Sequence, residues 1–264
     1  MIAAYAAFAR VSFLQILAYR MRYFIGIVTY LVNVTVYYFI WKALYRNGGV
    51  IQGFTFGQMV TYVAVGWIIR TFYFNNIDRE MANDIQQGHI GSKLARPVNY
   101  QWMHISQAAG ESLFRIMLFT VPTAAVILAV YPVQAPASWL AFTAFLCSLL
   151  FSFLIFASVN FLVGICSVYL HSILGLIRAK YFLIEILSGL IIPISFFPAS
   201  LVRLSQWLPF QHISYTPLLI YMGKITGLGL GRTILIEFAW ASALILAGHR
   251  AWNRAARKIV VQGG

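Results

Sequence analysis

Long stretches of this chain are apolar and carry no charge. The longest, residues 116–177, runs for 62 residues without an Asp, Glu, Lys or Arg. An α-helix rises about 1.5 Å per residue, so about 20 apolar residues are enough to cross the hydrocarbon of a bilayer. Apolar runs near or beyond this length alternate with short charged segments. The pattern therefore predicts an all-α, polytopic membrane protein.

The apolar runs predict six membrane-spanning helices in a single domain that covers residues 1–264. A Pro-containing break at residues 132–136 divides the longest run between the third and fourth spans. A segment rich in Pro and aromatic residues, 194–231, is predicted to join the last two spans on the external side. The predicted spans are residues 23–41, 56–69, 112–130, 139–169, 181–193 (continuing to 197) and 233–252.

The placement of basic residues predicts the orientation, because Lys and Arg beside spans stay on the side from which the chain is inserted. With the N-terminus inside, the external segments hold five of the 19 Lys and Arg residues, and Arg115 lies near a membrane boundary. Both termini and the loop at residues 75–102 are therefore predicted to be cytosolic. The 13 basic residues on that side are Arg10, Arg20, Arg22, Arg70, Arg79, Lys93, Arg96, Arg178, Lys180, Arg250, Arg254, Arg257 and Lys258.

Composition supports a membrane location and argues against other classes of protein. Hydrophobic residues make up 61% of the chain and charged residues 9%, an apolar excess that a water-soluble core of this size could not bury. The formal net charge of +13 is explained by basic residues beside anionic lipid headgroups. We therefore expect a lipid membrane, and no nucleic acid, as the partner of the basic residues.

The first 22 residues are predicted to form a helix that lies in the membrane interface. The segment does not read as a secretory signal peptide, because it lacks a charged start and Arg10 interrupts its apolar part. A cytosolic extension of the first span is the alternative. Apolar residues recur at steps of three and four, as a helix in the interface requires; they are Phe8, Val11, Leu14, Ala18 and Met21.

Few side chains point to catalysis or to nucleotide binding. The six acids and five His residues show no paired spacing typical of metal ligands. Residues 227–233 (GLGLGRT) lack the Lys-Ser/Thr end of a phosphate-binding loop, and we expect them to open the sixth span. Cys147 and Cys166 lie about five turns apart on one predicted helix, too far apart for a disulfide.

Three acids fall in or near the predicted spans, where a charge needs a partner. Glu111 and Arg115 are four residues apart, which predicts a salt bridge on one helix face. Glu185 and Glu237 have no basic neighbour at helical spacing. Hydrogen bonding between helices would account for both, and Glu185 is also a candidate for contact with a cationic substrate or a proton.

The loop at residues 75–102 holds half of the acids in the chain and has a helical pattern. Apolar residues repeat every four positions with acids between them, which predicts a short amphipathic helix that Gly88 can end in a left-handed conformation. A merely solvated loop is the alternative. The apolar positions are Ile77, Met81 and Ile85, and the acids predicted to face elsewhere are Asp78, Glu80 and Asp84.

With this loop the chain resembles the permease subunits of type-2 ABC exporters, in the bacterial branch that exports drugs and other amphiphiles. The resemblance rests on an acid followed by a Gly and by a Leu-x-Arg-Pro-Val return, and on the arrangement of the N-terminal helix and six spans. Asp84 stands where members of the family often carry Glu. The segment reads Asp84, Ile85, Gln86, Gln87, Gly88, then Lys93, Leu94, Ala95, Arg96, Pro97 and Val98.

The resemblance implies a half-transporter in the bacterial cytoplasmic (inner) membrane. It would not be an enzyme and would hold no metal or cofactor, because ATP and Mg would be bound by two copies of an ABC ATPase subunit. A second permease, identical or similar, would complete the transporter. The loop helix would act as a coupling helix, and contact with the ATPase would fall to Asp84, Ile85, Gln86, Gln87, Gly88, His89, Ile90, Arg96 and Pro97.

The resemblance also implies that the first, second and fifth spans line the translocation path. An aromatic path with few charges favours an apolar or cationic amphiphile as the exported substrate. Two other classes stay open: a membrane-embedded lipid-modifying enzyme, against which the lack of acid and His constellations argues, and a non-transporting scaffold. The candidate path residues are Tyr37, Trp41, Phe72, Tyr73 and Glu185.

Overall fold

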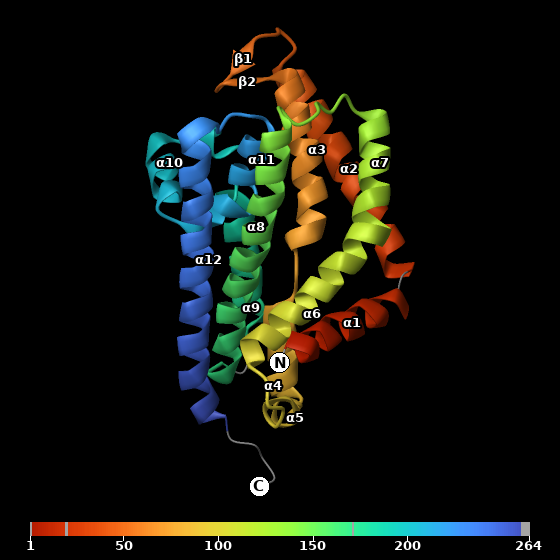
Figure 1. Cartoon of the computed structure of the whole chain (residues 1–264). Coiled ribbons are helices and arrows are strands. Elements are labelled where there is room, and N and C mark those ends of the chain that lie inside the picture. Colours follow the sequence, from red (N-terminus) through yellow and green to blue (C-terminus); the bar gives the residue numbers. More distant parts are fainter. Residues whose placement is uncertain (1, 19–20, 171, 260–264) are drawn as a thin grey trace.

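The computed structural model describes residues 2–18, 21–170 and 172–259, and it shows a bundle of long helices (Figure 1). Arg20, one of the basic residues predicted to be cytosolic, lies outside the described residues. A β-hairpin lies at one end of the bundle, and two short helices, α4 and α5, lie at the opposite end with the last turns of α12. The long helices are α2 (Met21–Leu44), α3 (Phe56–Tyr73), α8 (Trp139–Ile165) and α12 (Gly227–Ala255).

Four helical stretches of the described chain are long and apolar enough to cross a membrane. They overlap the predicted first, third, fourth and sixth spans, with different bounds. The predicted second span is α3, which has 18 residues but contains Arg70 and is mostly buried inside the bundle. The helices support an all-α membrane fold, and the number of six spans stays a prediction. The four stretches are Gly26–Leu44, Tyr100–Val130, Trp139–Val168 and Gly227–Lys258.

The predicted third span is the second half of a longer, bent helix. Helix α6 (Tyr100–Arg115) passes through a π-helical turn, η1 (Ile116–Thr120), into α7 (Val121–Val130), and the chain changes direction between them (Figure 1). Pro122 has no N–H group, so one carbonyl of the preceding turn loses its usual partner. A π-helical turn accommodates such a defect.

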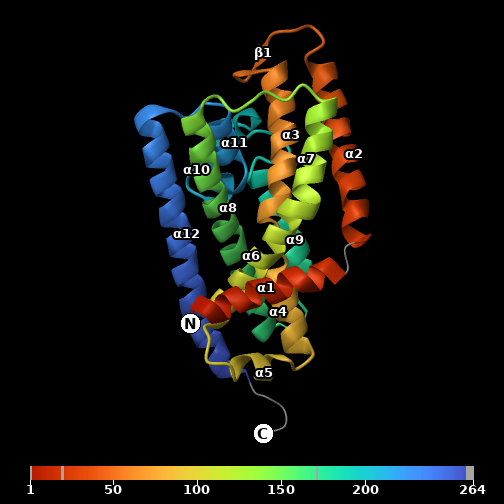
Figure 2. The ribbon, with the colours of Figure 1, turned by 45° about the vertical axis from the view of Figure 1, so that its right-hand side comes forward.

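The N-terminal helix α1 (Ile2–Ala18) runs across the bundle at a steep angle to the long helices and packs on α6 (Figure 2). The backbone N–H of Asn99 donates to the Tyr5 hydroxyl at 3.1 Å. Val11 and Leu14, on the predicted apolar face, are about half exposed. The side chains of Ala18 and Met21 lie outside the described residues, and the interfacial location of this helix stays a prediction.

The predicted fifth span differs most from the structure. Helix α9 (Leu174–Leu187) begins and ends earlier than predicted, and the chain then forms a series of short helices. Other elements take up the carbonyls freed at its end: the Tyr215 N–H donates to Ser188 at 2.9 Å, and the Tyr62 hydroxyl donates to Gly189. The short helices are η3 (Ile194–Phe196), α10 (Ala199–Gln206), η4 (Pro209–Ile213) and α11 (Tyr215–Tyr221).

Part of the predicted external segment is packed inside the bundle. His212, Ile213 and Leu218 are buried, and the Ser152 hydroxyl of α8 donates to the His212 carbonyl at 2.9 Å. The sequence pattern could not separate this packing from an external loop, because both use apolar and aromatic residues. The hairpin at this end pairs β1 (Val50–Ile51) with β2 (Phe54–Thr55).

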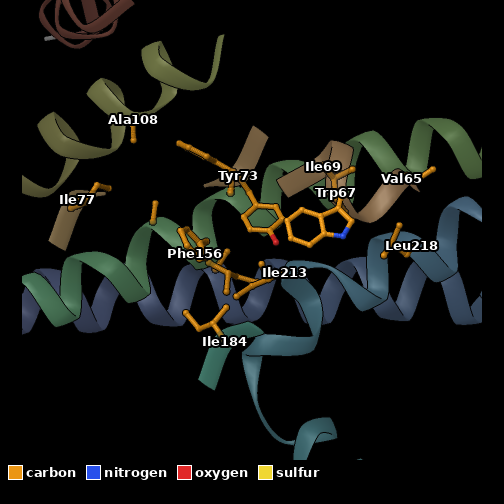
Figure 3. Packing of buried hydrophobic residues seen from close by; sticks show 14 of the residues in the cluster. Val65, Trp67, Ile69, Tyr73, Ile77, Ala108, Phe156, Ile184, Ile213 and Leu218 are labelled. Carbon is orange, nitrogen blue, oxygen red and sulfur yellow. The ribbon is translucent and has the colours of Figure 1, made fainter. Parts of the chain in front are cut away.

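The main core lies between α3 and α8 and extends to the short helices. Figure 3 shows Tyr73 of α3 close to Phe156 of α8, with their ring centroids 5.3 Å apart. The Tyr73 hydroxyl shares a hydrogen bond of 2.9 Å with Ser214. The core therefore holds α3, α8 and the segment before α11 together.

Candidate coupling site and substrate path

The predicted loop helix is present as α4 (Ile77–Gln86), followed by α5 (Ile90–Leu94). We call α4, α5 and the residues up to Pro97 the tip. Gly88 joins the two helices with φ +73°, a left-handed conformation that favours glycine. Ile77 and Met81 are buried, as their spacing predicts. The helical pattern of this loop is confirmed.

The prediction for Asp78 is wrong in one respect, because this acid does not face away from the protein. Asp78 is fully buried, and its Oδ2 lies 2.5 Å from Nζ of Lys180 in α9. Lys180, which the placement of basic residues predicts to lie on the cytosolic side, is buried as well. Since Ala82 lies one turn after Asp78 and is also buried, this side of α4 packs on the bundle.

The Asp78–Lys180 pair belongs to a small buried network. The Lys180 ammonium also donates to Oδ1 of Asn160 in α8 at 2.5 Å. The Asn160 amide in turn donates to the carbonyl and to Oδ1 of Asn75, both at 2.9 Å. A buried charge is tolerated only where such partners surround it. The network therefore fixes the start of α4 to both α8 and α9.

A close contact with α8 adds to this attachment. A Cβ atom built on Gly164 would come within 2.6 Å of the Met81 sulfur and 3.2 Å of the Asp78 Cα atom. Only a residue without a side chain allows α4 to approach α8 this closely. Helix α4 is thus held against α8 by packing and against α9 by charge.

The other two acids of the tip, Glu80 and Asp84, also lie near basic side chains. Asp84 lies 2.5 Å from the Lys93 ammonium, which links α4 to α5. Glu80 lies 3.7 Å from Nδ1 of the buried His104 in α6. The tip is therefore a folded unit with an internal ion pair and is not a merely solvated loop.

The predicted coupling residues divide into exposed and covered positions. Asp84 is paired with Lys93, Ile85 is half-buried against the core, and Ile90 is buried. Contact with an ATPase stays a prediction for all of them, and a partner would reach the covered three only in part. The exposed positions are Gln86, Gln87, Gly88, His89, Arg96 and Pro97.

On the predicted path, Glu185 has the partner that the sequence did not reveal. Its Oε1 lies 2.5 Å from the Arg70 guanidinium of α3. The expectation of bonding between helices, one of the two readings of Glu185, is therefore met. Tyr37 lies on the same side, with its ring centroid 6.2 Å from that of Trp67.

The other three path candidates face the interior or another side. Trp41 and Tyr73 are buried, with Trp41 packed edge-on against Phe196 at 5.4 Å. Phe72 faces a separate apolar cavity of about 690 Å³ between α3, α7 and α8. The role of all three in a path stays a prediction.

The other acids predicted near the spans are also paired. Arg115 donates to Oε2 of Glu111 at 2.6 Å, as their spacing predicts, and it donates to the Phe74 carbonyl too. Glu237 of α12 accepts a hydrogen bond of 2.7 Å from Ser148 of α8, which is a bond between helices. No group of three or more His, Cys, Asp or Glu in the described ranges could hold a metal ion.

Sequence reasoning missed a cavity of about 440 Å³ where α2, α3 and α9 meet. Arg79, Arg115 and Tyr181 contribute to its lining. These residues come from α4, α6 and α9, so only the folded chain brings them together. We call this space the arginine cavity.

Comparison with known protein families shows to which family the chain belongs. A family model described as "ABC-2 family transporter protein" matches residues 31–263, which is most of the chain. The chain belongs to this family. No curated protein and no solved structure matches it. The ABC-2 family assignment confirms the resemblance to type-2 ABC permeases that the loop at residues 75–102 indicated.

Family membership fixes the coarse role of this ABC-2 transporter protein. It is a multi-pass membrane protein and a permease subunit of an ABC transporter. Such a subunit is a transport component and not itself a catalyst. The family also implies partnership with an ABC ATPase subunit.

Proposed function

We propose that the chain is one half of an ATP-driven exporter for an amphiphilic substrate in a bacterial inner membrane. It pairs with a second permease, identical or similar, and with two copies of an ABC ATPase that binds ATP and Mg. The tip and both termini lie in the cytosol. The observation that carries this proposal is the structure of the tip: its exposed side is free for a partner, while its buried side packs on α8 at Gly164 and is joined to α9 by the Asp78–Lys180 pair.

The proposed mechanism follows the contacts of the tip inward. Closure of the ATPases on ATP displaces the exposed turn around Gln87. Helix α4 transmits this displacement as a rigid unit, because Gly164 packs it on α8 and Asp78 binds it to Lys180 of α9. Helix α9 carries Glu185, which bonds α3, so a shift of α9 changes the spacing of the helices that line the proposed path.

Crosslinking to the ATPase tests this function. We would replace Cys147 and Cys166 by Ser and add a single cysteine by Gln87→Cys at the tip or by Gln52→Cys in the hairpin turn. A short thiol–amine crosslinker should join the tip variant, and not the hairpin variant, to the co-expressed ABC ATPase subunit. Equal crosslinking of the two variants, or none at the tip of a complex that copurifies, would refute the coupling role.

A further inference from the structure

The arginine cavity lies on the side where the proposed path would run. Its lining includes residues of α2, α3 and α9, which correspond to the predicted first, second and fifth spans, together with residues of α4, α6 and η1. The Arg70–Glu185 pair lies beside it, close to Tyr30 in its wall. A ligand in this space would therefore contact the helices that the proposed mechanism moves.

One basic side chain of this region is not neutralised by the protein. Four basic residues surround the cavity and three are paired, Arg70 with Glu185 at 2.5 Å, Arg115 with Glu111 at 2.6 Å and Lys180 with Asp78 at 2.5 Å. The fourth is Arg79, which is exposed. Its guanidinium makes no hydrogen bond or ion pair within residues 2–18, 21–170 and 172–259.

The other acids of the chain cannot balance Arg79. Glu80, its neighbour in α4, lies toward His104 and lines a different cavity. Asp84 is engaged by Lys93, and Glu237 is bonded by Ser148 of α8. Since all six acids are thereby accounted for, the charge of Arg79 is left for a ligand or for solvent.

The aromatic walls are also unsuited to a cationic ligand. Cations are attracted to the faces of aromatic rings, but at two of the four rings in the lining, Phe74 and Tyr181, the protein's own cations lie over those faces. The Phe74 ring has Arg70 at 5.8 Å and Arg115 at 5.9 Å, and the Tyr181 ring has the Lys180 ammonium at 3.8 Å. A second cation would meet these charges without a carboxylate to offset them.

We propose that the arginine cavity binds the anionic headgroup of an amphiphile, a carboxylate, phosphate or sulfate, with Arg79 as its ion-pair partner. A guanidinium presents paired N–H donors that match such oxygens. Asn76 supplies further N–H donors, since its Oδ1 already accepts from the Tyr181 hydroxyl at 3.2 Å. The apolar tail lies along Phe74 and Phe119.

This inference names the substrate class of the proposed exporter. It rests on the proposed export function only if the bound ligand is the exported molecule. It replaces the cationic substrate expected from the sequence by an anionic one, because Glu185 is already bonded to Arg70. The same headgroup chemistry has two sources, an anionic lipid of the surrounding bilayer or an amphiphile that is transported. The experiment has an arm for each.

Binding of two probes with matched tails tests the charge preference. The full-length protein in phosphatidylcholine nanodiscs would be titrated with undecanoic acid that carries a dansyl group at its far end, and with undecylamine that carries the same group. We expect the acid to bind at least about tenfold more tightly than the amine, which is the effect of one charge-assisted hydrogen bond. Equal binding of both probes, or tighter binding of the amine, would overturn the proposal.

Substitution of Arg79 tests the site. Arg79→Gln should weaken binding of the acid about tenfold, and Arg79→Lys, which keeps the charge but loses the paired donors, should weaken it less. Arg178→Gln is the matched control, because Arg178 is an exposed arginine of α9 outside the cavity. If Arg79→Gln and Arg178→Gln behave alike, the cavity is not the site. Monodisperse elution and an unchanged melting temperature of each variant show that it is folded.

Two further measurements show whether the bound headgroup comes from a bilayer lipid or from an exported amphiphile. Displacement of the acid by phosphatidylglycerol in the nanodisc assigns the site to bilayer lipid. ATP-dependent uptake of the acid by inverted vesicles, lost in Arg79→Gln, assigns the site to the exported substrate.

The export function and the anion site can also be tested separately, because probe binding needs no ATPase. Failure of tip crosslinking with intact acid binding would overturn the proposed export function alone. Normal crosslinking with no preference for the acid would overturn this inference alone.

Discussion

The Asp78–Lys180 pair is the residue-scale feature on which the proposed coupling depends. Asp78→Asn would leave the Lys180 ammonium buried without its counter-charge, and breaking a buried pair from one side costs about 3–5 kcal/mol. We therefore expect a clearly lower melting temperature in detergent and loss of ATPase stimulation. Thermal unfolding followed by tryptophan fluorescence measures the first effect.

A double variant serves as the control for this pair. Asp78→Asn combined with Lys180→Met removes both charges, and replacing a buried pair by uncharged groups is often close to neutral. The double variant should therefore regain most of the lost stability. A melting temperature of Asp78→Asn equal to that of the unmodified protein would show that the pair does not hold α4.

Sequence alone could not predict this pair. Asp78 and Lys180 are 102 residues apart, and no local spacing in the sequence pairs one with the other. The local pattern did predict Glu111 with Arg115, because both lie on one helix at a spacing of four. Partners within one helix are readable from the sequence, whereas partners on two helices need the fold.

At the scale of the elements, the turn between α4 and α5 depends on the backbone of Gly88. Residues with a Cβ atom pay about 1–2 kcal/mol for a left-handed conformation, so Gly88→Ala should loosen the tip without removing any contact. Gly175→Ala in α9 is the matched control: an added Cβ meets no atom within 4 Å at either position, and only Gly88 has a positive φ. Hydrogen–deuterium exchange of residues 84–95 should rise about tenfold in Gly88→Ala.

Equal exchange in the two Ala variants would show that the α4–α5 turn does not need the left-handed conformation.

The helix α4 and its end at Gly88 were predictable, because the four-residue repeat and the glycine are local signals. The end of α9 was not. Its freed carbonyls are bonded by Tyr62 and Tyr215 from distant parts of the chain, and the uncharged sequence continues past it.

At the scale of the whole molecule, the charge pattern and the fold agree on which segments lie together. Helix α1, the tip and the last turns of α12 share one end of the bundle, and the hairpin lies at the other (Figures 1 and 2). The sequence predicted this grouping from the basic residues alone. It could not predict the arginine cavity, whose lining comes from α2, α3, α4, α6, η1 and α9, which only tertiary packing brings together.

The orientation of the whole molecule in the membrane is the last prediction. In a chain without Cys147 and Cys166, single cysteines would be introduced by Gln52→Cys at the hairpin end and by Gln87→Cys at the tip, both at exposed positions. A membrane-impermeant maleimide applied to intact spheroplasts should label the hairpin variant and reach the tip variant only after permeabilisation. Most basic residues flank the tip end, and reversing the chain would move them across the membrane against the positive-inside preference. Labelling of the tip in intact spheroplasts would place it away from ATP, and coupling to a cytosolic ATPase through α4 would then be impossible.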